Sequence, residues 1–557
     1  MGQTHDVVSH VDWHHICYLF ISSLILLNHA SICSATIQEF YSLEDQEAYI
    51  NYYKQLPGPL RNFTNEGMFM VAKCAELTLK EYNDRYQVAY QLRYITDAWI
   101  EDQNDLIKLV VIVESNNLQY YEMYLEAKSI LTPKFISTSI VKAAFILKKE
   151  DNSCDKLSSR AGCTECTLFE RCAKGHVPAH PWLDFALKTQ QEIQIDQEFP
   201  KVQMPAAHNA FNNRADYYGV FDDCPWPPPY SAECIGLANQ EFSLTDMLNM
   251  GIRSLEIDPW WCFDEMRMSH ASVHAIGCGP TDRLFEYGMK EIGQWIHKPE
   301  NNGIVIRIYF EDGPDHTKGY DHLINGPIKK YFGDYVFTPS DRIKLGRWPT
   351  MREMRNLNKT VIVTSANTYT HGGVFIQDGY WTEYKRSKFT PYPTCGKSSI
   401  ANVLRYYCDS TNYGPFWNGP KETGVILDFS EFMKCGIEYP AADQVNPTLL
   451  ETAVWTWAKD EPNHPLTKQS CVFLNGTDHR WYLSPSCQTM LPHACLSSSQ
   501  SDVWVLGSKA TYDNSAACPQ GYHFSLPLNG FHQQKLNEVS LNQSVWLNVT
   551  PYLPLLF

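Results

Sequence analysis

Residues 251–261 read GIRSLEIDPWW, and the middle of this stretch has the alternation of a β-strand. At a period of two, Glu256 and Asp258 lie on one face of the strand, and Leu255 and Ile257 lie on the other. Two carboxylates this close repel each other and are stable as anions only near a cation. Oxygen ligands at this spacing suit Ca²⁺ or Mg²⁺. The pair predicts a cation site at the end of an apolar strand, with a solvated strand end as the alternative.

Around this stretch, residues 196–440 alternate short apolar strands with longer helical stretches, which is typical of a βα domain. The first predicted strand ends in Pro205–Phe211. The further predicted strands are Gly251–Asp258, Met266–His270, Gly303–Glu311, Asn358–Ser365 and Gly424–Phe429. Helices are predicted at Phe242–Asn249 and Asp282–His297. Polar residues stand at or just past the strand ends. In a closed βα barrel, that rim is where active sites are built.

Six polar residues at these strand ends form the candidate site: His208, Asn209, Glu256, Asp258, His270 and Glu311. By alternation, Arg307 and Glu311 share the polar face of their strand, with Glu311 at the barrel mouth and Arg307 deeper. Each residue alone has a simpler explanation, such as a hydrogen-bonded histidine or a solvated glutamate. Together, one amide and three carboxylates supply oxygen ligands from three strand ends, with two histidines beside them. This set suits the cleavage of a phosphate ester.

The segments PAAHNAF, GIRSLEIDPWW, MRMSH and NGIVIRIYFED, in this order, resemble the catalytic core of phosphatidylinositol-specific phospholipase C of the X-domain type. This family lies within the superfamily of PLC-like phosphodiesterases. The resemblance covers roughly residues 196–435 and extends to RWPTMREM at 347–354 and to GVILDFSEF, with Asp428. It implies an α/β fold with a TIM-type (βα) barrel.

The resemblance also implies roles for the site residues. The positions that match the metal ligands of the calcium-dependent members are Asn209, Glu256, Asp258 and Glu311. His208 matches the histidine that hydrogen-bonds the phosphoryl oxygen. His270 matches the general acid that protonates the leaving alcohol, with His274 as the alternative. Glu311 or Glu256 would help to deprotonate the attacking hydroxyl.

In this family the attacking group is the inositol 2-hydroxyl, and a cyclic phosphodiester forms that water then opens. Bacterial members carry an arginine in place of the metal. Asp258 stands at the matching strand here, which favours the metal-dependent form, with Ca²⁺ as the expected ion and Mg²⁺ as the alternative.

The sequence pattern at the N-terminus predicts a signal peptide. Residues 16–27 form an apolar run of signal-peptide length, and cleavage is predicted near Ala35. A signal anchor is the alternative, although the run is short for a bilayer span. Two of the 18 cysteines precede residue 36, so an even number remains, and acceptor sequons occur at Asn62, Asn358, Asn475, Asn542 and Asn548. We therefore expect a secreted, disulfide-bonded glycoprotein.

Four regions are expected: a signal peptide (1–35), an N-terminal β-rich region (36–195), the barrel (196–440) and a C-terminal disulfide-rich accessory module (441–557). In the second region, Leu106–Glu114 and Phe135–Leu147 read as strands. Cys163 and Cys166 have zinc-ligand spacing, but an oxidising compartment favours disulfides. In the last region, the segments HRWYLSPSCQ, CPQGYHFSLP and VWLNV resemble carbohydrate-binding or C-type-lectin-like modules. The resemblance implies glycan binding, with ordinary Trp- and Cys-rich packing as the alternative. The cysteines expected to staple this region are Cys471, Cys487, Cys495 and Cys518.

Composition narrows the function. Hydrophobic residues make up 44% and charged residues 19%, as in a globular protein. The net charge of −16 argues against a nucleic-acid partner. The leading hypothesis is a phospholipase acting on a phospholipid or phosphodiester at a membrane surface. The alternatives are a glycerophosphodiester or sphingomyelin-type phosphodiesterase, and a non-catalytic adhesion glycoprotein built on a relic barrel.

Overall fold

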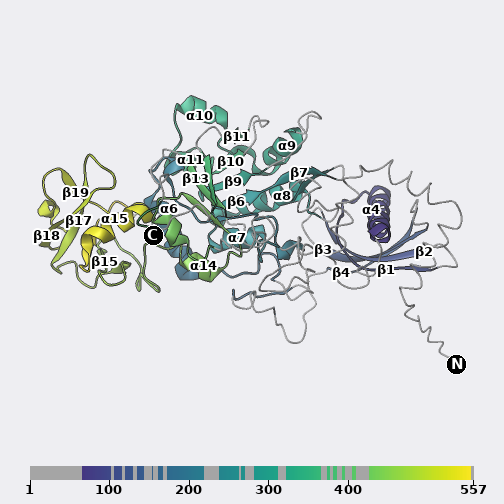
Figure 1. Ribbon diagram of the computed structural model, residues 1–557, viewed down its shortest axis with the longest axis horizontal. Coiled ribbons are helices and arrows are strands. Elements are labelled where there is room, and N and C mark those ends of the chain that lie inside the picture. The colour runs from purple at the N-terminus through teal and green to yellow at the C-terminus, as the bar shows by residue number, and fades with distance from the viewer. Residues whose placement is uncertain are drawn as a thin grey trace, which may run out of the picture.

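The computed structural model describes most of the chain from residue 65 onward. The described residues are 65–101, 106–115, 120–128, 134–143, 154, 161–166, 172–218, 238–262, 265–269, 282–311, 321–365, 373–376, 381–385, 392–395, 404–408 and 426–552. Three parts follow one another along the longest axis, with the N-terminal sheet at one end and the C-terminal sheet at the other (Figure 1). The signal segment, Asn62, His270 and His274 lie outside the described residues.

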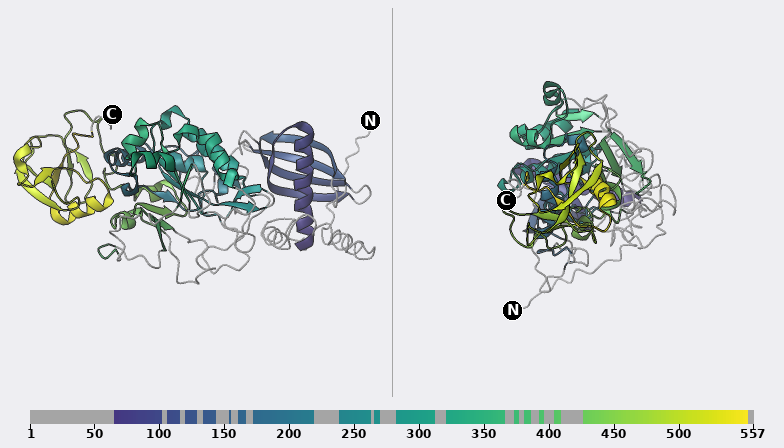
Figure 2. Two further views of the ribbon diagram at one scale, coloured as in Figure 1. Left: turned by 90° about the horizontal axis from the view of Figure 1, so that it is seen from above. Right: turned by 90° about the vertical axis from the view of Figure 1, so that its left-hand side faces the viewer.

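The N-terminal part is an antiparallel sheet covered by one helix. Its strands pair in the order β1-β2-β3-β4. Their bounds are β1 Gln91–Glu101, β2 Leu106–Glu114, β3 Tyr120–Lys128 and β4 Lys134–Ala143. The predicted strands at 106–114 and 135–147 are thus confirmed over their described residues. Helix α4 (Asn65–Tyr86), which was not predicted, lies across this sheet (Figure 2) and buries Ala75, Leu79 and Tyr82 at helical spacing.

The central part is an α/β unit with an eight-stranded parallel sheet in the order β11-β10-β9-β6-β5-β14-β13-β12. Its strands are β5 Ala206–Ala207, β6 Ser254–Ile257, β9 Ile306–Phe310, β10 Val361–Ser365, β11 Val374–Ile376, β12 Trp381–Lys385, β13 Leu404–Cys408 and β14 Tyr439–Ala442. Strands β11 and β12 are the sheet edges, and no pairing between them occurs among the described residues. The parallel α/β architecture is therefore as predicted, whereas the described residues form an open sheet and not a closed barrel.

Helices and short 3-10 turns connect these strands. The α-helices are α6 Pro181–Ile193, α7 Leu244–Met250, α8 Phe285–Ile296, α9 Asp321–Phe332, α10 Pro339–Leu345, α11 Met351–Asn356, α13 Phe429–Met433 and α14 Pro447–Glu451. The 3-10 turns are η2 Phe199–Lys201, η3 Arg214–Asp216, η4 Pro299–Asn301 and η6 Gly333–Tyr335. The two helices predicted at 242–249 and 282–297 correspond to α7 and α8.

Two predicted strands differ in the structure. The segment at 266–270 forms β8 (Glu265–Met268), but it pairs antiparallel with β7 (Pro259–Cys262) in a separate hairpin. Asp428 does not end a strand. Its side chain accepts a hydrogen bond from the backbone N–H of Ser430 at 2.7 Å and caps α13, so the apolar run before it leads into a helix. The last strand of the sheet is instead β14.

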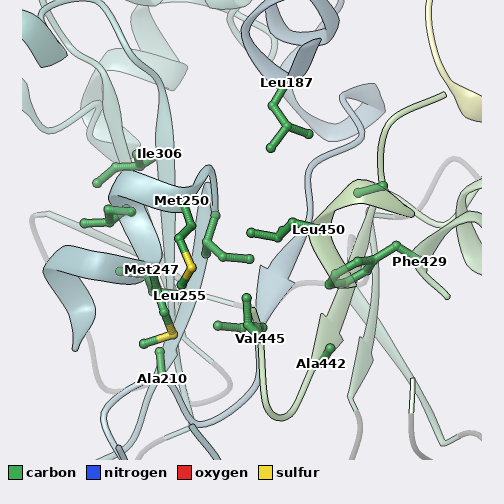
Figure 3. Close-up of a cluster of buried hydrophobic side chains, with 14 of the residues drawn as sticks. Leu187, Ala210, Met247, Met250, Leu255, Ile306, Phe429, Ala442, Val445 and Leu450 are labelled. Atoms are coloured by element: carbon green, nitrogen blue, oxygen red, sulfur yellow. The ribbon is translucent and has the colours of Figure 1, made fainter. Parts of the chain in front are cut away.

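The core of the central part extends past the expected limits of 196 and 440. Helix α6 belongs to it, because the side chains of Gln190 and Gln191 donate hydrogen bonds to the carbonyls of Ala453 and Val305 at 3.1 and 3.0 Å. Figure 3 shows apolar side chains from α6, α7, α13, α14 and the strands converging in this core.

The C-terminal part is a six-stranded, mostly antiparallel sheet with one helix. Its elements are β15 Val472–Leu474, β16 Trp481–Leu483, β17 Leu491–Ser497, β18 Trp504–Ala510, η8 Ser515–Ala517, β19 Tyr522–Phe524, α15 Gly530–Ser540 and β20 Val545–Leu547. Trp481 joins it to the central part, because its ring lies 5.9 Å from those of Trp455 and Trp457.

Disulfides bond the cysteine clusters as the composition predicts. The bonds among the described residues are Cys154–Cys166, Cys163–Cys172, Cys395–Cys435, Cys471–Cys487 and Cys495–Cys518. The zinc alternative for Cys163 and Cys166 is therefore excluded. Cys74 is a buried free thiol, so the even cysteine count does not mean that every cysteine is bonded.

Candidate active site

The turn before strand β6 sets the direction of this strand, which carries Glu256. Ser243 is the N-cap of helix α7, and its side chain accepts a hydrogen bond from the N–H of Asp246; Gly251 is the C-cap. Gly251 has φ of +117°, and a Cβ there would stand 2.3 Å from Cδ1 of Leu187. Only glycine therefore allows the chain to reverse against α6 and enter β6.

Three carboxylates gather at the C-terminal edge of the sheet. Glu256, Asp258 and Glu311 offer oxygen atoms that all lie within 4.8 Å of one another. Strands β6 and β9 are parallel neighbours, with Ile257 opposite Phe310, so residues at their ends meet at one edge. Glu256 and Asp258 are only 1% and 2% exposed, whereas Glu311 is exposed. Buried carboxylates this close repel one another, and a hard divalent cation fits this donor set.

His208 follows β5 and is fixed by a carboxylate that the sequence analysis missed. Its Nδ1 lies 2.8 Å from Oδ1 of Asp443, and both side chains are buried. A carboxylate only accepts hydrogen bonds, so Nδ1 carries a proton and donates it to Asp443. The amide of Asn239 donates to the same oxygen of Asp443 at 2.8 Å and holds it in place. The imidazole is therefore held in one orientation, with Nε2 turned toward Asn209.

Asn209 links the histidine to the carboxylates. Its backbone has φ of +44°, a left-handed conformation that asparagine tolerates better than most residues. Its N–H donates to Oε2 of Glu256 at 3.3 Å, and its side-chain Nδ2 lies 3.0 Å from Nε2 of His208. Since Nδ2 faces the ring, the amide oxygen is on the opposite branch of the side chain. This orientation is compatible with a ligand role for that oxygen.

Arg307 lies in the layer below, as its place on the alternating strand predicts. The guanidinium is fully buried and donates to the hydroxyls of Ser254 and Thr364 at 3.0 and 3.1 Å. Its carbon lies 4.6 Å from the ring centre of Tyr439 and 5.3 Å from that of Tyr309. These aromatic faces and hydroxyls stabilise the buried cation beneath the carboxylate cluster.

The structure thus brings together five of the six predicted site residues: His208, Asn209, Glu256, Asp258 and Glu311. His270 and its alternative His274 lie outside the described residues. The preceding residue is placed at the site, because the N–H of Ser269 donates to the carbonyl of Asp258 at 2.9 Å. The Ser269 hydroxyl also donates to Asp282 at 2.8 Å.

Asp443 and Asn239 are the site residues that sequence reasoning missed. Asp443 directly follows the strand Tyr439–Ala442, at the same edge as the other strand-end residues. That position was the available signal, but the four-residue strand contains Pro440 and has no alternation, so it was not recognised.

Comparisons with known proteins match part of the central unit. The family PI-PLC X 1 matches residues 233–396, a range that includes Glu256, Asp258 and Glu311 but not His208 or Asp443. The PI-PLC X domain-containing protein 1 of Arthroderma benhamiae is 31% identical over 129 residues, which is 22% of this chain and 39% of that protein.

A longer match reaches proteins without an assigned activity. An uncharacterized protein of Mycobacterium tuberculosis, present in strains CDC 1551 / Oshkosh and H37Rv, is 23% identical over 410 residues. The match covers 64% of this chain and 77% of that protein. The chain therefore contains, within a longer region shared with this bacterial protein, a segment that resembles the PI-PLC X domain.

Proposed function

We propose that this protein is a secreted, metal-dependent phosphodiesterase of the phospholipase C type. Its substrate would be phosphatidylinositol or a related phospholipid, cleaved through a cyclic phosphodiester. The observation that carries the proposal is the direct connection, through Asn209, between the His208–Asp443 pair and the cluster of three carboxylates. A histidine held beside a cation site is an arrangement that suits phosphoryl transfer.

Each residue has a proposed role in this chemistry. The residues that would hold the ion are Asn209, Glu256, Asp258 and Glu311, and a bound Ca²⁺ or Mg²⁺ would neutralise phosphate charge. When protonated, His208 donates its Nε2–H to a phosphoryl oxygen, and Asp443 stabilises the resulting imidazolium. Glu256 or Glu311 accepts the proton of the attacking hydroxyl. His270 protonates the leaving alcohol.

The order of the strands supports a barrel as the full architecture. Strand β14 pairs with β5, so the last strand of the sheet lies beside the first, and the remaining neighbours follow chain order. Pairing of β11 with β12 would close the ring. We include this closure in the proposal because it would enclose the Arg307 layer beneath the carboxylates.

Secretion is supported by the disulfides, since bonds of this number are typical of oxidising compartments. Within the described part of the chain, no helix has the length and hydropathy to cross a membrane.

The test is cleavage of phosphatidylinositol in vesicles by the purified full-length chain, with the water-soluble products identified by phosphorus NMR. We expect an inositol cyclic phosphate, loss of activity with a chelator, and recovery on adding back Ca²⁺. His208→Ala and His270→Ala are expected to lower the rate by about 10²–10⁴ each. The control is His523→Ala, because that histidine is exposed on the C-terminal sheet.

The products also separate the substrate classes. The protein is also assayed on a panel of lipids with different headgroups. Release of glycerol phosphate or of a cyclic ceramide phosphate would show that the substrate belongs to another class than the inositol lipids. Full activity in His208→Ala would reject the assignment of the site.

A further inference from the structure

A second site lies at the junction of the central and C-terminal parts, away from the carboxylate cluster. It is a pocket of about 170 Å³ formed by α13, the segment after α14, the turn between β15 and β16, and α15. Helix α15 stands at this junction in Figure 1. The lining residues that matter here are Lys434, Trp455, Asp478, His479 and Arg480.

The pocket contains a guanidinium that no carboxylate contacts directly, although Asp478 and Asp428 lie near enough to act on it electrostatically. Arg480 forms no side-chain hydrogen bond or ion pair with any residue that the structure describes, and burial lowers its pKa. Asp478 is close, but its two oxygens accept the backbone N–H of Arg480 at 3.1 Å and the hydroxyl of Tyr482 at 2.6 Å. Asp428 is occupied as the cap of α13. The half-buried guanidinium thus keeps N–H donors that no described side chain accepts, and this arrangement favours a bound anion.

Two further basic side chains line the same pocket. Lys434 lies at the end of α13, and its ammonium has no ion pair among the described residues. His479 has a buried Nδ1 without a hydrogen-bond partner in that part of the chain. Three basic side chains thus converge on one small space in a chain whose net charge is −16.

The turn that carries His479 and Arg480 is rigid. The backbone N–H of His479 donates to the carbonyl of Asn475 at 3.0 Å, and the N–H of Asn475 donates to the carbonyl of Arg480 at 2.9 Å. Gly476 packs so closely that a Cβ there would stand 2.3 Å from the carbonyl oxygen of Asn542. The basic groups are therefore held in place before any ligand arrives, which lowers the entropic cost of binding.

We propose that this pocket binds a tetrahedral oxyanion, a phosphate or sulfate group, with Arg480 as its main ligand. A guanidinium matches two oxygens of such a group at once, Lys434 adds a further positive charge, and His479 adds a ring nitrogen. The volume of about 170 Å³ corresponds to about six water molecules. It is well below the roughly 300 Å³ at which pockets for drug-sized ligands begin. The site therefore takes one small anionic group, either as a free ion or as the end of an ester.

The experiment is calorimetric titration of the chelator-treated full chain at constant ionic strength. Inorganic phosphate, sulfate and glycerol 3-phosphate are titrated separately, with chloride as the reference anion. Binding of inorganic phosphate or sulfate identifies a site for a free ion, and binding of glycerol 3-phosphate alone identifies a site for an ester group. Both results support the proposal. No binding of any of the three up to about 10 mM overturns it.

Variants locate the binding. Arg480→Gln is expected to weaken it at least about tenfold, because a charge-assisted hydrogen bond is lost. Lys434→Gln should have a smaller effect, and Lys509→Gln, an exposed lysine of the same sheet, should have none. The melting temperature without anion checks folding, and phosphate should raise it for the wild type but not for Arg480→Gln. Unchanged affinity in both Arg480→Gln and Lys434→Gln would place the anion elsewhere and refute the site.

Discussion

The carboxylate of Asp443 holds Nδ1 of His208 at 2.8 Å across a sequence separation of 235 residues. The two residues follow β14 and β5, which are parallel neighbours, so the pairing of the last and first strands of the sheet creates the contact. The orientation of His208 therefore depends directly on the strand order of the central sheet.

Asp443→Asn tests this relationship. An asparagine of nearly the same shape presents either an amide N–H or a neutral oxygen to Nδ1, so it no longer stabilises an imidazolium. We expect kcat for phosphodiester cleavage to fall about 10²-fold or more, with KM little changed. Asn239→Ala should have a smaller effect in the same direction, because it removes only a support of Asp443. An unchanged kcat in Asp443→Asn would separate the pair from the chemistry.

Asp258→Asn tests the cation site without relying on activity. Removing one of three converging carboxylates should weaken Ca²⁺ binding, measured by calorimetry, at least about tenfold. Glu311→Gln should weaken it less, because Glu311 is exposed and partly screened. Glu300→Gln, on an exposed turn, is the control. Equal Ca²⁺ affinity in wild type and Asp258→Asn would contradict the assignment of the carboxylates.

The parts of this site that the sequence predicts are those on strands with one fully apolar face. Ile306, Ile308 and Phe310 alternate with Arg307 and Tyr309, so the periodicity places Arg307 in the interior and Glu311 at the strand end. Such alternation requires a strand of at least four or five residues with side chains that differ in polarity.

The parts that the sequence does not predict lack this alternation of apolar and polar side chains. The strand before Asp443 consists of Tyr, Pro and two alanines, all buried. The run before Asp428 is apolar enough for a strand, but Leu427 is 74% exposed and Asp428 caps a helix. Tertiary packing decides both cases, and the local sequence around Asp443 and Asp428 is too weak a signal to predict it.

The interface between the N-terminal sheet and the central part contains a buried charge cluster. Arg283 pairs with Glu114 at 2.7 Å, with Asp216 at 3.0 Å and with Glu291, and Lys174 contacts the same carboxylates. Two cations thus face three carboxylates. Arg283→Met leaves three buried carboxylates against one lysine, so we expect it to destabilise the protein by about 3–5 kcal/mol.

Glu114→Gln balances the charges of the same cluster, so its cost should be about 1.5–3 kcal/mol, the loss of charge-assisted hydrogen bonds. Urea unfolding of both full-length variants measures the difference. Equal destabilisation would mean that charge balance does not govern this interface.

His532, on α15, makes the stability of the C-terminal part depend on pH. Burial lowers its pKa to about 4, whereas an unfolded chain has a histidine pKa of about 6.5. Between these values the unfolded state binds more protons, so the stabilisation is present above pH 6.5 and is lost as the pH falls toward 4. Between pH 7 and pH 5, the free energy of unfolding should therefore fall by up to about 2 kcal/mol less in His532→Gln than in the wild type. Thermal unfolding at both pH values measures this difference, with His523→Gln, an exposed histidine of the same part, as the control. Parallel losses in wild type and His532→Gln would show that His532 takes up no proton on unfolding.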